Sequence, residues 1–347
     1  WAKEISQKTL KYLKGNNKID VASSKLVVSN FEVREIAKFF KKEEIDLLLV
    51  HFCTFCLGSI IPELISNLNV PIVMLALPEP DFNGCRIRSN AFCALNMNSH
   101  ILYKLGVKYR SLLGSIENQG LGKEFDNIIS AFYVDKNIKS KRIGLIGSRA
   151  PGFYTSNFDE LKLRKVLGIE VENIDISKVY IGAEKIGREE LTDKTKYFRE
   201  HINKKTEVSK EDLEKLIKVY LSLLKISKEY QLDYFAIKCW PEFHEDYGIA
   251  ICPVLSMLNN IGIMTACEGD IYGAVTMIIQ RYISGKFPFF SDFISLDTDT
   301  NTGLFWHCGS APWNLARNKN EVILSNYPRI QKEFPEMGCT FDFPIDA

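Results

Sequence analysis

Arg142-Ile-Gly-Leu-Ile-Gly147 is a short apolar run that ends in a glycine turn, and it decides the fold class. A run of this length, preceded by polar residues, is typical of a strand that is buried on both faces of a sheet. Similar runs recur along the chain and alternate with segments of helical period. We expect strands at residues 45–50, 71–76, 142–147, 170–174, 234–238 and 262–266. The alternation predicts an α/β fold with parallel sheets.

Segments with apolar residues at helical spacing lie between these runs. We expect helices at residues 1–14, 33–42, 59–68, 90–105, 158–167, 210–230, 248–259 and 271–283. Asn157 and Glu160 are spaced as a capping box for one of these helices, and Gly168 provides its end. The charged segment 181–214 is expected to be a surface connection that leads into the next helix.

Composition limits the classes of function that the chain can have. Its 347 residues are enough for two or three domains, and we expect them to be part of a longer polypeptide. The 44 Lys and Arg residues against 43 Asp and Glu residues exclude a broad basic surface for nucleic acid. No apolar run is long enough to cross a membrane, and no secretory signal is present. The nine cysteines, mostly within apolar runs, predict buried reduced thiols and a cytoplasmic protein.

Two motifs that suggest cofactor chemistry have simpler interpretations. The glycines from Gly144 to Gly152 lack the spacing of a dinucleotide-binding turn, and Pro151 would interrupt the helix that such a turn requires. We interpret this segment as a tight turn at the end of a strand. Cys53 and Cys56 form a lone C-x-x-C pair without the partners that a zinc site needs, so we interpret them as buried thiols.

Acidic residues follow two of the expected strands. Glu242 comes shortly after the run 234–238, and Glu268 and Asp270 directly follow the next run. Because the carboxyl ends of parallel strands meet at one edge of a sheet, we expect these carboxylates to converge. Converging carboxylates repel one another unless a cation lies between them. The alternative is that Glu242 belongs to a charged helix N-terminus and that Asp270 caps a helix.

A further apolar segment, residues 302–306, is expected to be a third strand that ends at the same edge, and His307 follows it. The alternative for His307 is a packed core histidine. Two carboxylates and one imidazole form an oxygen-rich site that suits Mn²⁺ or Mg²⁺. Such a site stabilises an enediolate, and the nearby aromatic side chains of Trp240, Trp306 and Trp313 are suited to stack on a sugar. The pattern therefore predicts metal-assisted chemistry on a small sugar.

Ala266-Cys-Glu268-Gly-Asp270-Ile-Tyr-Gly-Ala-Val-Thr-Met resembles the metal-binding turn and helix of the L-fucose isomerase/L-arabinose isomerase superfamily. Four more segments are similar to its fucose-isomerase-like branch: residues 238–242, 306–312, 78–90 and 144–154. Together these segments extend over most of the chain. The resemblance implies two Rossmann-like parallel-sheet domains followed by a C-terminal domain that is incomplete here. We expect the domains at residues 1–137, 138–295 and 296–347.

The resemblance also implies an aldose–ketose isomerase that depends on Mn²⁺ and proceeds through a cis-enediol. Asp270 matches the metal aspartate of the family, and Glu242 is the candidate for the second carboxylate and for the general base, with Glu268 next. An alternative alignment places the family glutamate inside the following helix, where this chain has Ile251 and Cys252. His307 is assigned as the metal histidine from its place after a strand.

The oligomeric state and the choice between an enzyme and a binding protein are the remaining expectations. The resemblance implies a homo-oligomer, a trimer or hexamer, with active sites between subunits. Arg86 and Arg88 are expected either to bind sugar hydroxyls in a neighbouring subunit or to be ordinary surface residues. The main alternative function is a non-catalytic sugar-binding or regulatory protein derived from the same family. The identity of the sugar is not predicted, because it depends on a few hydroxyl partners.

Overall fold

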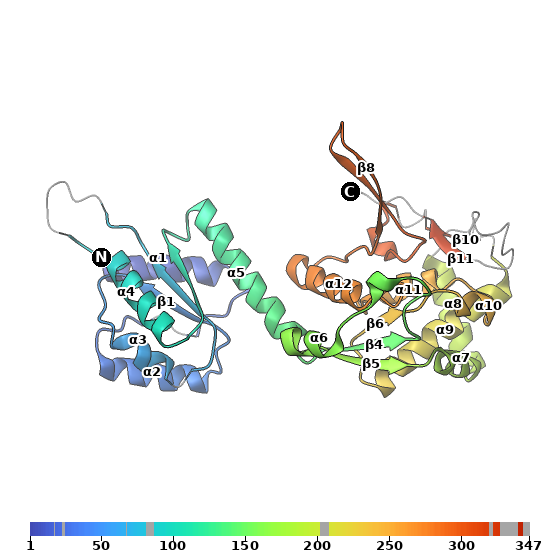
Figure 1. Ribbon diagram of the computed structural model, residues 1–347, viewed down its shortest axis with the longest axis horizontal. Coiled ribbons are helices and arrows are strands. Elements are labelled where there is room, and N and C mark those ends of the chain that lie inside the picture. Colours follow the sequence, from blue (N-terminus) through green and yellow to red (C-terminus); the bar gives the residue numbers. More distant parts are fainter. Residues whose placement is uncertain are drawn as a thin grey trace. The chain divides into compact units, whose positions relative to one another are not determined.

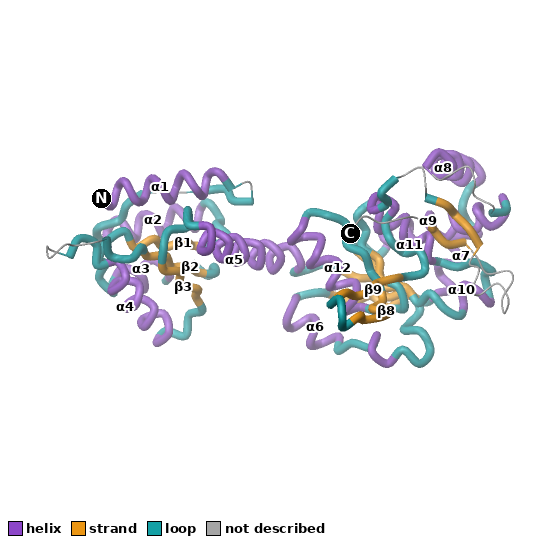
Figure 2. Tube along the Cα trace, turned by 90° about the horizontal axis from the view of Figure 1, so that it is seen from above, coloured by secondary structure: helices purple, strands orange, loops and turns teal. Residues whose placement is uncertain are grey.

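The computed structural model describes residues 1–16, 18–22, 25–66, 68–80, 87–201, 208–318, 322–326 and 339–342. The chain divides into two compact units, Trp1–Phe132 and Tyr133–Ala347. Each unit contains a parallel sheet with helices on both faces (Figures 1 and 2). The predicted α/β fold with parallel sheets is therefore confirmed. None of the described helices combines the length and the apolar character needed to cross a membrane.

The first unit has a three-stranded parallel sheet in the order β1-β2-β3. Every residue of the central strand β2 is buried, because helices cover both faces of the sheet. Met74 packs with the helices of one face, and Val73 and Leu75 pack with those of the other. The elements are α1 (Ala2–Gly15), α2 (Asn30–Lys42), β1 (Leu48–Phe52), α3 (Ile60–Ile65), β2 (Ile72–Ala76), α4 (Ala91–Lys104), β3 (Tyr109–Leu113) and α5 (Gln119–Ile138), which continues into the second unit.

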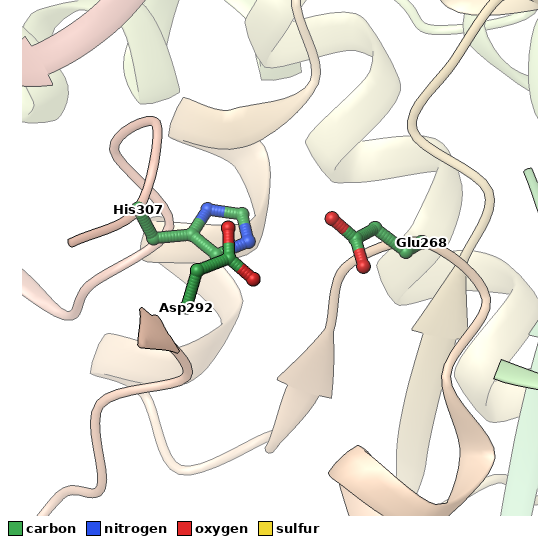
Figure 3. Close-up of side chains that lie close together, drawn as sticks. All are labelled: Glu268, Asp292 and His307. Carbon is green, nitrogen blue, oxygen red and sulfur yellow. The ribbon is translucent and has the colours of Figure 1, made fainter. Parts of the chain in front are cut away.

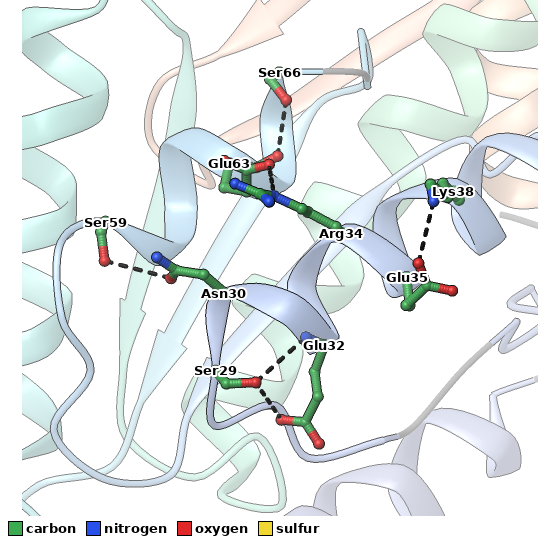
Figure 4. A network of polar contacts seen from close by, with 9 residues as sticks. All are labelled: Ser29, Asn30, Glu32, Arg34, Glu35, Lys38, Ser59, Glu63 and Ser66. Atoms are coloured by element: carbon green, nitrogen blue, oxygen red, sulfur yellow. Dashed lines mark hydrogen bonds and ion pairs between the residues drawn. The ribbon is translucent and has the colours of Figure 1, made fainter.

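Polar contacts fix the start of α2 and join it to α3. Ser29 Oγ accepts a hydrogen bond from the Glu32 N–H at 3.3 Å, and the Glu32 carboxylate accepts one from the Val28 N–H at 2.9 Å. This reciprocal capping satisfies N–H groups that have no partner within a helix. Arg34 on α2 and Glu63 on α3 form an ion pair at 2.7 Å (Figure 4). The pair joins two helices that cover the same face of the sheet.

The second unit has a four-stranded parallel sheet in the order β5-β4-β6-β7. Successive strand residues point to opposite faces, so Phe235 packs with α7, α9 and α11 while Ala236 packs with α12. The strands are β4 (Arg142–Ile146), β5 (Glu170–Ile174), β6 (Tyr234–Ile237) and β7 (Thr265–Ala266). The helices are α6 (Glu160–Leu167), α7 (Ile176–Glu184), α8 (Arg188–His201), α9 (Lys210–Glu229), α10 (Glu242–Glu245), α11 (Cys252–Asn260) and α12 (Ile271–Ser284).

The order of these strands locates the edge at which ligands bind in open α/β sheets. The chain passes from β4 to β5 on one side and then returns to β6 on the other side of β4. Such a reversal opens a crevice at the carboxyl ends of the two central strands. The loops that follow β4, β6 and β7 are therefore the places to search for a site.

Two antiparallel hairpins follow the parallel sheet. β8 (Asp292–Asp297) pairs with β9 (Thr302–Trp306), and β10 (Ile323–Asn326) pairs with β11 (Cys339–Asp342). All residues of β8 and β9 are exposed, and β8 projects from the second unit in Figure 1. Residues 302–306 form the predicted strand, β9, but it pairs with β8 in a separate hairpin and is not part of the parallel sheet.

Two local expectations also change. The segment 181–214 is not a plain surface connection, because it contains α8, whose Leu191 and Phe198 are buried. Helix α6 is not capped by Asn157. Its N-cap is Asp159, whose side chain accepts a hydrogen bond from the Lys162 N–H at 2.9 Å. The helix ends at Gly168 in the left-handed conformation, as predicted.

Candidate metal centre

The loops after β4, β6 and β7 meet at the carboxyl edge of the second sheet. The Gly269 N–H donates to the Ile237 carbonyl at 3.0 Å, and the Ala150 N–H donates to the Glu268 carbonyl at 3.4 Å. Gly269 has a φ of +68°, and a Cβ at this residue would collide with the Ser148 carbonyl oxygen. Glycine is therefore required beside Glu268, because other residues would push the loops apart.

Glu268 has two unusual properties. Its backbone φ is +63°, a left-handed conformation that costs a non-glycine residue of the order of 1 kcal/mol. Its side chain is half-buried, and burial, followed by the charges of Asp292 and Asp270, raises the pKa of its carboxyl group to about 7. A bound cation would offset the repulsion between Glu268 and the neighbouring acids and would favour the charged form of its carboxyl group.

Glu268, Asp292 and His307 come together at this edge. One potential ligand atom from each residue lies within 4.8 Å of the other two, and the side chains face one another in Figure 3. Glu268 follows β7, Asp292 is the first residue of β8, and His307 follows β9. Asp292 also pairs with Trp306 in the hairpin register, so the base of the hairpin holds Asp292 beside His307.

His307 is buried, with 6% of its surface exposed. Its Nδ1 accepts a hydrogen bond from the Cys308 N–H at 2.8 Å, and the Phe290 ring packs beside it at 5.4 Å between centroids. Its Nε2 is buried without a hydrogen-bond partner among the described residues. In Figure 3 this nitrogen faces the two carboxylates. Because buried polar atoms normally have partners, an additional group is expected at this point.

The three donors fit a divalent cation of the Mn²⁺ or Mg²⁺ type. Carboxylates are hard ligands and imidazole is a ligand of intermediate softness. Asp292 is exposed, which leaves room for water or substrate oxygens. The cluster contains two of the predicted metal residues, Glu268 and His307. Asp292 was not predicted, since the only signal in the sequence is an acid in front of a strand.

Asp270 lies near this cluster but has a clear structural role. It is the N-cap of α12, and its Oδ1 accepts a hydrogen bond from the Gly273 N–H at 2.8 Å. Its charge nevertheless acts on Glu268, as the raised pKa of that residue indicates. The cap that we gave as the alternative interpretation is therefore present, and metal binding by Asp270 stays a prediction.

Glu242 has a different environment from the cluster. It is the first residue of α10, and its Oε1 forms an ion pair with Lys238 Nζ. Its Oε2 is buried without a hydrogen-bond partner among the described residues. It also lies near Tyr180, where burial first, then the charges of Asp246 and Glu242, raise the pKa of the phenol. Glu242 is not one of the three clustered ligands.

The predicted sugar-binding residues differ in their exposure. Trp240 and Trp306 are about two-fifths exposed, whereas Trp313 is buried against Phe198 at 5.3 Å in the core. Stacking on a sugar is therefore better suited to the two exposed tryptophans than to Trp313. Arg88 lies in the first unit with an exposed side chain. Arg86 lies outside the described residues.

Comparison with known proteins shows similarity to sugar isomerases. A family model described as Fucose/sulfoquinovose isomerase, N-terminal domain, matches residues 2–134, nearly the whole first unit. The sulfoquinovose isomerases of Priestia aryabhattai and Priestia megaterium (strain ATCC 12872 / QMB1551) are each 26% identical over 345 residues, which is 98% of this chain and 75% of the relative. The sulfoquinovose isomerase of Alkalicoccus urumqiensis is 26% identical over 305 residues, 87% of this chain and 67% of the relative.

These findings support the fucose-isomerase-like sugar isomerases as the family of this chain. Because the similarity to named isomerases extends over nearly the whole chain, this fucose-isomerase-like protein is an enzyme of the aldose–ketose isomerase class. The comparisons therefore favour an enzyme over the alternative of a non-catalytic sugar-binding protein. The predicted family resemblance is confirmed.

Proposed function

We propose that the fucose-isomerase-like protein binds Mn²⁺ or Mg²⁺ through Glu268, Asp292 and His307 and interconverts an aldose with its ketose at this centre. The observation that carries the proposal is the meeting of two carboxylates and a buried imidazole nitrogen that has no hydrogen-bond partner among the described residues. When bound, the cation supplies positive charge that polarises neighbouring substrate oxygens and stabilises an enediolate. The remaining steps belong to residues of the chain.

The metal ligands must first reach the correct protonation state. Glu268 has to lose the proton that its raised pKa of about 7 favours in the metal-free protein. His307 can offer Nε2 to a cation only as the tautomer with hydrogen on Nδ1, so the Cys308 N–H bond to Nδ1 has to break when the metal binds. Because Glu268 loses its proton, metal binding is expected to release a proton and to weaken as the pH falls below about 7.

Isomerisation also needs a base that moves a proton between C2 and C1 of the sugar. We propose Glu242 for this role, because its Oε2 has no partner among the described residues while Lys238 holds Oε1. General acid–base help of this kind contributes about 10²–10⁴-fold to a rate. Glu268 is the second candidate. In both cases the proton is taken from C2, is held on one carboxylate oxygen and is returned to C1.

The substrate class is proposed from the relatives. Four of them are named sulfoquinovose isomerases, and sulfoquinovose carries an anionic sulfonate. We propose a hexose with an anionic or deoxy terminal carbon. We propose Arg149 as the cation that binds this anionic group. Its neighbour in the chain, Ala150, donates a hydrogen bond to the Glu268 carbonyl, so Arg149 is held beside the loop that carries Glu268. Its guanidinium lies 4.9 Å from the centroid of the Tyr154 ring.

Assembly and compartment complete the proposal. We propose a cytoplasmic homo-oligomer, a trimer or hexamer, as the family resemblance implies. Arg88 would then act on a neighbouring subunit, and an active monomer would exclude that role. Sedimentation equilibrium of the metal-loaded protein, run together with an isomerase assay, measures both properties in one sample.

The experiment that tests the proposed function measures bound Mn²⁺ and ketose formation in the same preparations. Wild-type protein should bind one Mn²⁺ per chain and convert an aldose from a panel of sulfoquinovose, fucose and glucose. Glu242→Gln should keep the metal and lose turnover, since the amide keeps the shape of the side chain and loses its basicity. Near-normal turnover in Glu242→Gln would move the base to Glu268. Arg149→Met should reduce activity on sulfoquinovose more than activity on uncharged sugars.

A further inference from the structure

Asn259 on α11 is a fully buried polar residue that joins two segments of the second unit. Its Oδ1 accepts a hydrogen bond from the Thr265 N–H at 2.6 Å, and its Nδ2 donates to the Thr265 carbonyl at 3.0 Å and to the Ser310 carbonyl at 3.3 Å. Thr265 is the first residue of β7 and lies three residues before Glu268, and Ser310 lies three residues after His307. One side chain therefore links the two backbones that lead to these proposed ligands.

The partners of Asn259 determine which kind of side chain can serve at this position. They are one backbone N–H and two backbone carbonyls, so the side chain must accept one hydrogen bond and donate two. An amide has one carbonyl oxygen and two N–H groups, whereas a carboxylate donates none and a hydroxyl has a single hydrogen. An apolar side chain of similar size would fill the space, but it would leave these buried backbone groups without the bonds that they make here.

Two neighbouring side chains of α11 bind the same loop. Ser256 Oγ donates to the Ala311 carbonyl, and Asn260 Oδ1 accepts a hydrogen bond from the Asn314 N–H at 3.0 Å. Residues 259 and 260 are three and four positions after residue 256, so all three lie on one face of the helix. The bonds of Ser256 and Asn260 attach the loop to α11, whereas Asn259 also binds β7. Asn260 is therefore a matched control for Asn259.

Sheet pairing does not by itself place His307 beside Glu268. Glu268 follows β7 of the parallel sheet, but His307 follows β9, which pairs with β8 in a separate and exposed hairpin. The two side chains nevertheless bring potential ligand atoms within 4.8 Å of each other. The Phe290 ring packs beside the imidazole at 5.4 Å between centroids, but a ring contact sets no hydrogen-bonding direction. The bonds of Asn259 join the two backbones directly and in a fixed direction.

We propose that Asn259 is a positioning residue for the metal centre, because it holds the segments after β7 and β9 at the separation that lets Glu268 and His307 bind one cation. The inference rests on the proposed function, since it concerns the same centre. Ligands that are held in place before binding lose less conformational freedom when the metal binds, so this link raises metal affinity. Asn259 acts through the backbone of residues 265 and 310 and contacts neither the ion nor the substrate.

The test compares Asn259→Ala with Asn260→Ala in the full chain. Isothermal titration with Mn²⁺ should show an affinity about 10–100-fold lower in Asn259→Ala, as expected when a group that orients metal ligands is lost. Asn260→Ala should change the affinity by no more than about twofold. The electron paramagnetic resonance spectrum of bound Mn²⁺ at saturation should broaden in Asn259→Ala, because the ligand positions vary, and should match the wild type in Asn260→Ala. A loss of stability alone would not change this spectrum.

A second variant and a metal-free measurement complete the test. Asn259→Ser keeps a smaller group that can make one of the three bonds, so its Mn²⁺ affinity should lie between those of the wild type and Asn259→Ala. It also replaces the alanine variant if that variant does not fold. In metal-free protein, hydrogen exchange at the Thr265 N–H should be at least about tenfold faster in Asn259→Ala than in the wild type, because the bond to Oδ1 is lost.

The outcomes separate this inference from the proposed function. Wild-type Mn²⁺ affinity in folded Asn259→Ala, or in Asn259→Ser where the alanine variant does not fold, would overturn the inference and leave the metal centre in place. Equal losses in Asn259→Ala and Asn260→Ala would also overturn it, because the effect would then belong to attachment of the loop as a whole. If the wild type binds no Mn²⁺, the proposed metal centre is wrong, and the exchange at Thr265 alone decides whether Asn259 holds β7.

Discussion

Glu79 and Glu268 both follow a strand of a parallel sheet, but their surroundings act in opposite directions. In the first unit, the Glu79 carboxylate accepts hydrogen bonds from the N–H groups of Arg88, Ser89 and Asn90 and from Ser89 Oγ. The hydroxyl of Ser89, followed by these N–H groups, lowers the pKa of Glu79 to about 2. In the second unit, burial and two neighbouring acids raise the pKa of Glu268 to about 7.

The difference shows what makes an acid at the end of a strand a functional residue. Glu79 has its charge satisfied by the backbone at the start of α4, so it stabilises the local fold and has no need of a ligand. Glu268 faces Asp292 and a nitrogen without a partner among the described residues, so its charge needs a cation. The position after a strand is common to both residues, and the available hydrogen-bond donors distinguish them.

The largest expected effect is the loss of metal from Glu268→Gln. Removing one of two carboxylates should weaken Mn²⁺ binding by more than about 100-fold, because a neutral amide is a poor ligand for a hard dication. Glu79→Gln is the matched variant and should bind Mn²⁺ as the wild type does. Isothermal titration of the two variants measures the contrast, and equal metal affinities in both would remove Glu268 from the centre.

A smaller effect on the metal is expected for Asp270→Asn. Asparagine is about as good an N-cap as aspartate, so α12 should keep its stability while the charge beside Glu268 is lost. We expect Mn²⁺ affinity to fall by less than about tenfold and the thermal midpoint to change by only a few degrees. Complete loss of the metal in Asp270→Asn would instead make Asp270 a direct ligand.

The two glutamates should also give opposite pH dependence of stability. The contribution of Glu79 is present above pH 4.5, its ordinary pKa, and is lost as the pH falls towards 2. In metal-free protein, Glu268 favours the folded state below pH 4.5, and that advantage is lost as the pH rises through 7.

Urea unfolding of chelator-treated protein at pH 4 and pH 8 tests this contrast. Glu268→Gln should be more stable than the wild type at pH 8 and similar to it at pH 4. Glu79→Gln should be less stable than the wild type at pH 8, and the difference should diminish towards acid pH. The same sign for both variants at pH 8 would contradict the assignment of their environments.

The smallest expected effect is local opening at the start of α4 in Glu79→Gln. A neutral amide accepts hydrogen bonds more weakly than a carboxylate, so the backbone N–H groups of residues 88–90 should exchange about three- to tenfold faster. Hydrogen exchange read by mass spectrometry measures this, with peptides of β6 as the internal reference. Unchanged exchange would show that neighbouring contacts are sufficient to hold this turn.

The sequence predicts the buried strands well because their apolar character is nearly continuous. β2 and β4 are found where the pattern placed them. β3 was not predicted, because Tyr109-Arg-Ser-Leu-Leu is an edge strand with mostly exposed side chains and no clear period. The hairpin of β8 and β9 was also missed as a pair, since pairing between strands is not encoded in the pattern of either strand alone.

The candidate site was predicted in part for a similar reason. Glu268 could be found because it directly follows an apolar run, and His307 because it ends another. Asp292 could not be found, since it is an exposed acid whose importance comes from pairing opposite Trp306. Glu242 follows β6 as expected, its Oε1 pairs with Lys238, and its role at the metal stays a prediction. Side-chain direction after a turn is decided by tertiary contacts.

The β8–β9 hairpin determines where this enzyme can accept insertions and deletions. Its two ends carry Asp292 and His307, whereas its turn, residues 298–301, is bounded by Asp297, which accepts hydrogen bonds from the Asp299 and Thr300 N–H groups. Insertions in this turn should leave the ligands in place, which makes it a suitable point for attaching a reporter. A single-residue deletion within β8 would instead reverse its side-chain alternation beyond the cut and separate the two ligands.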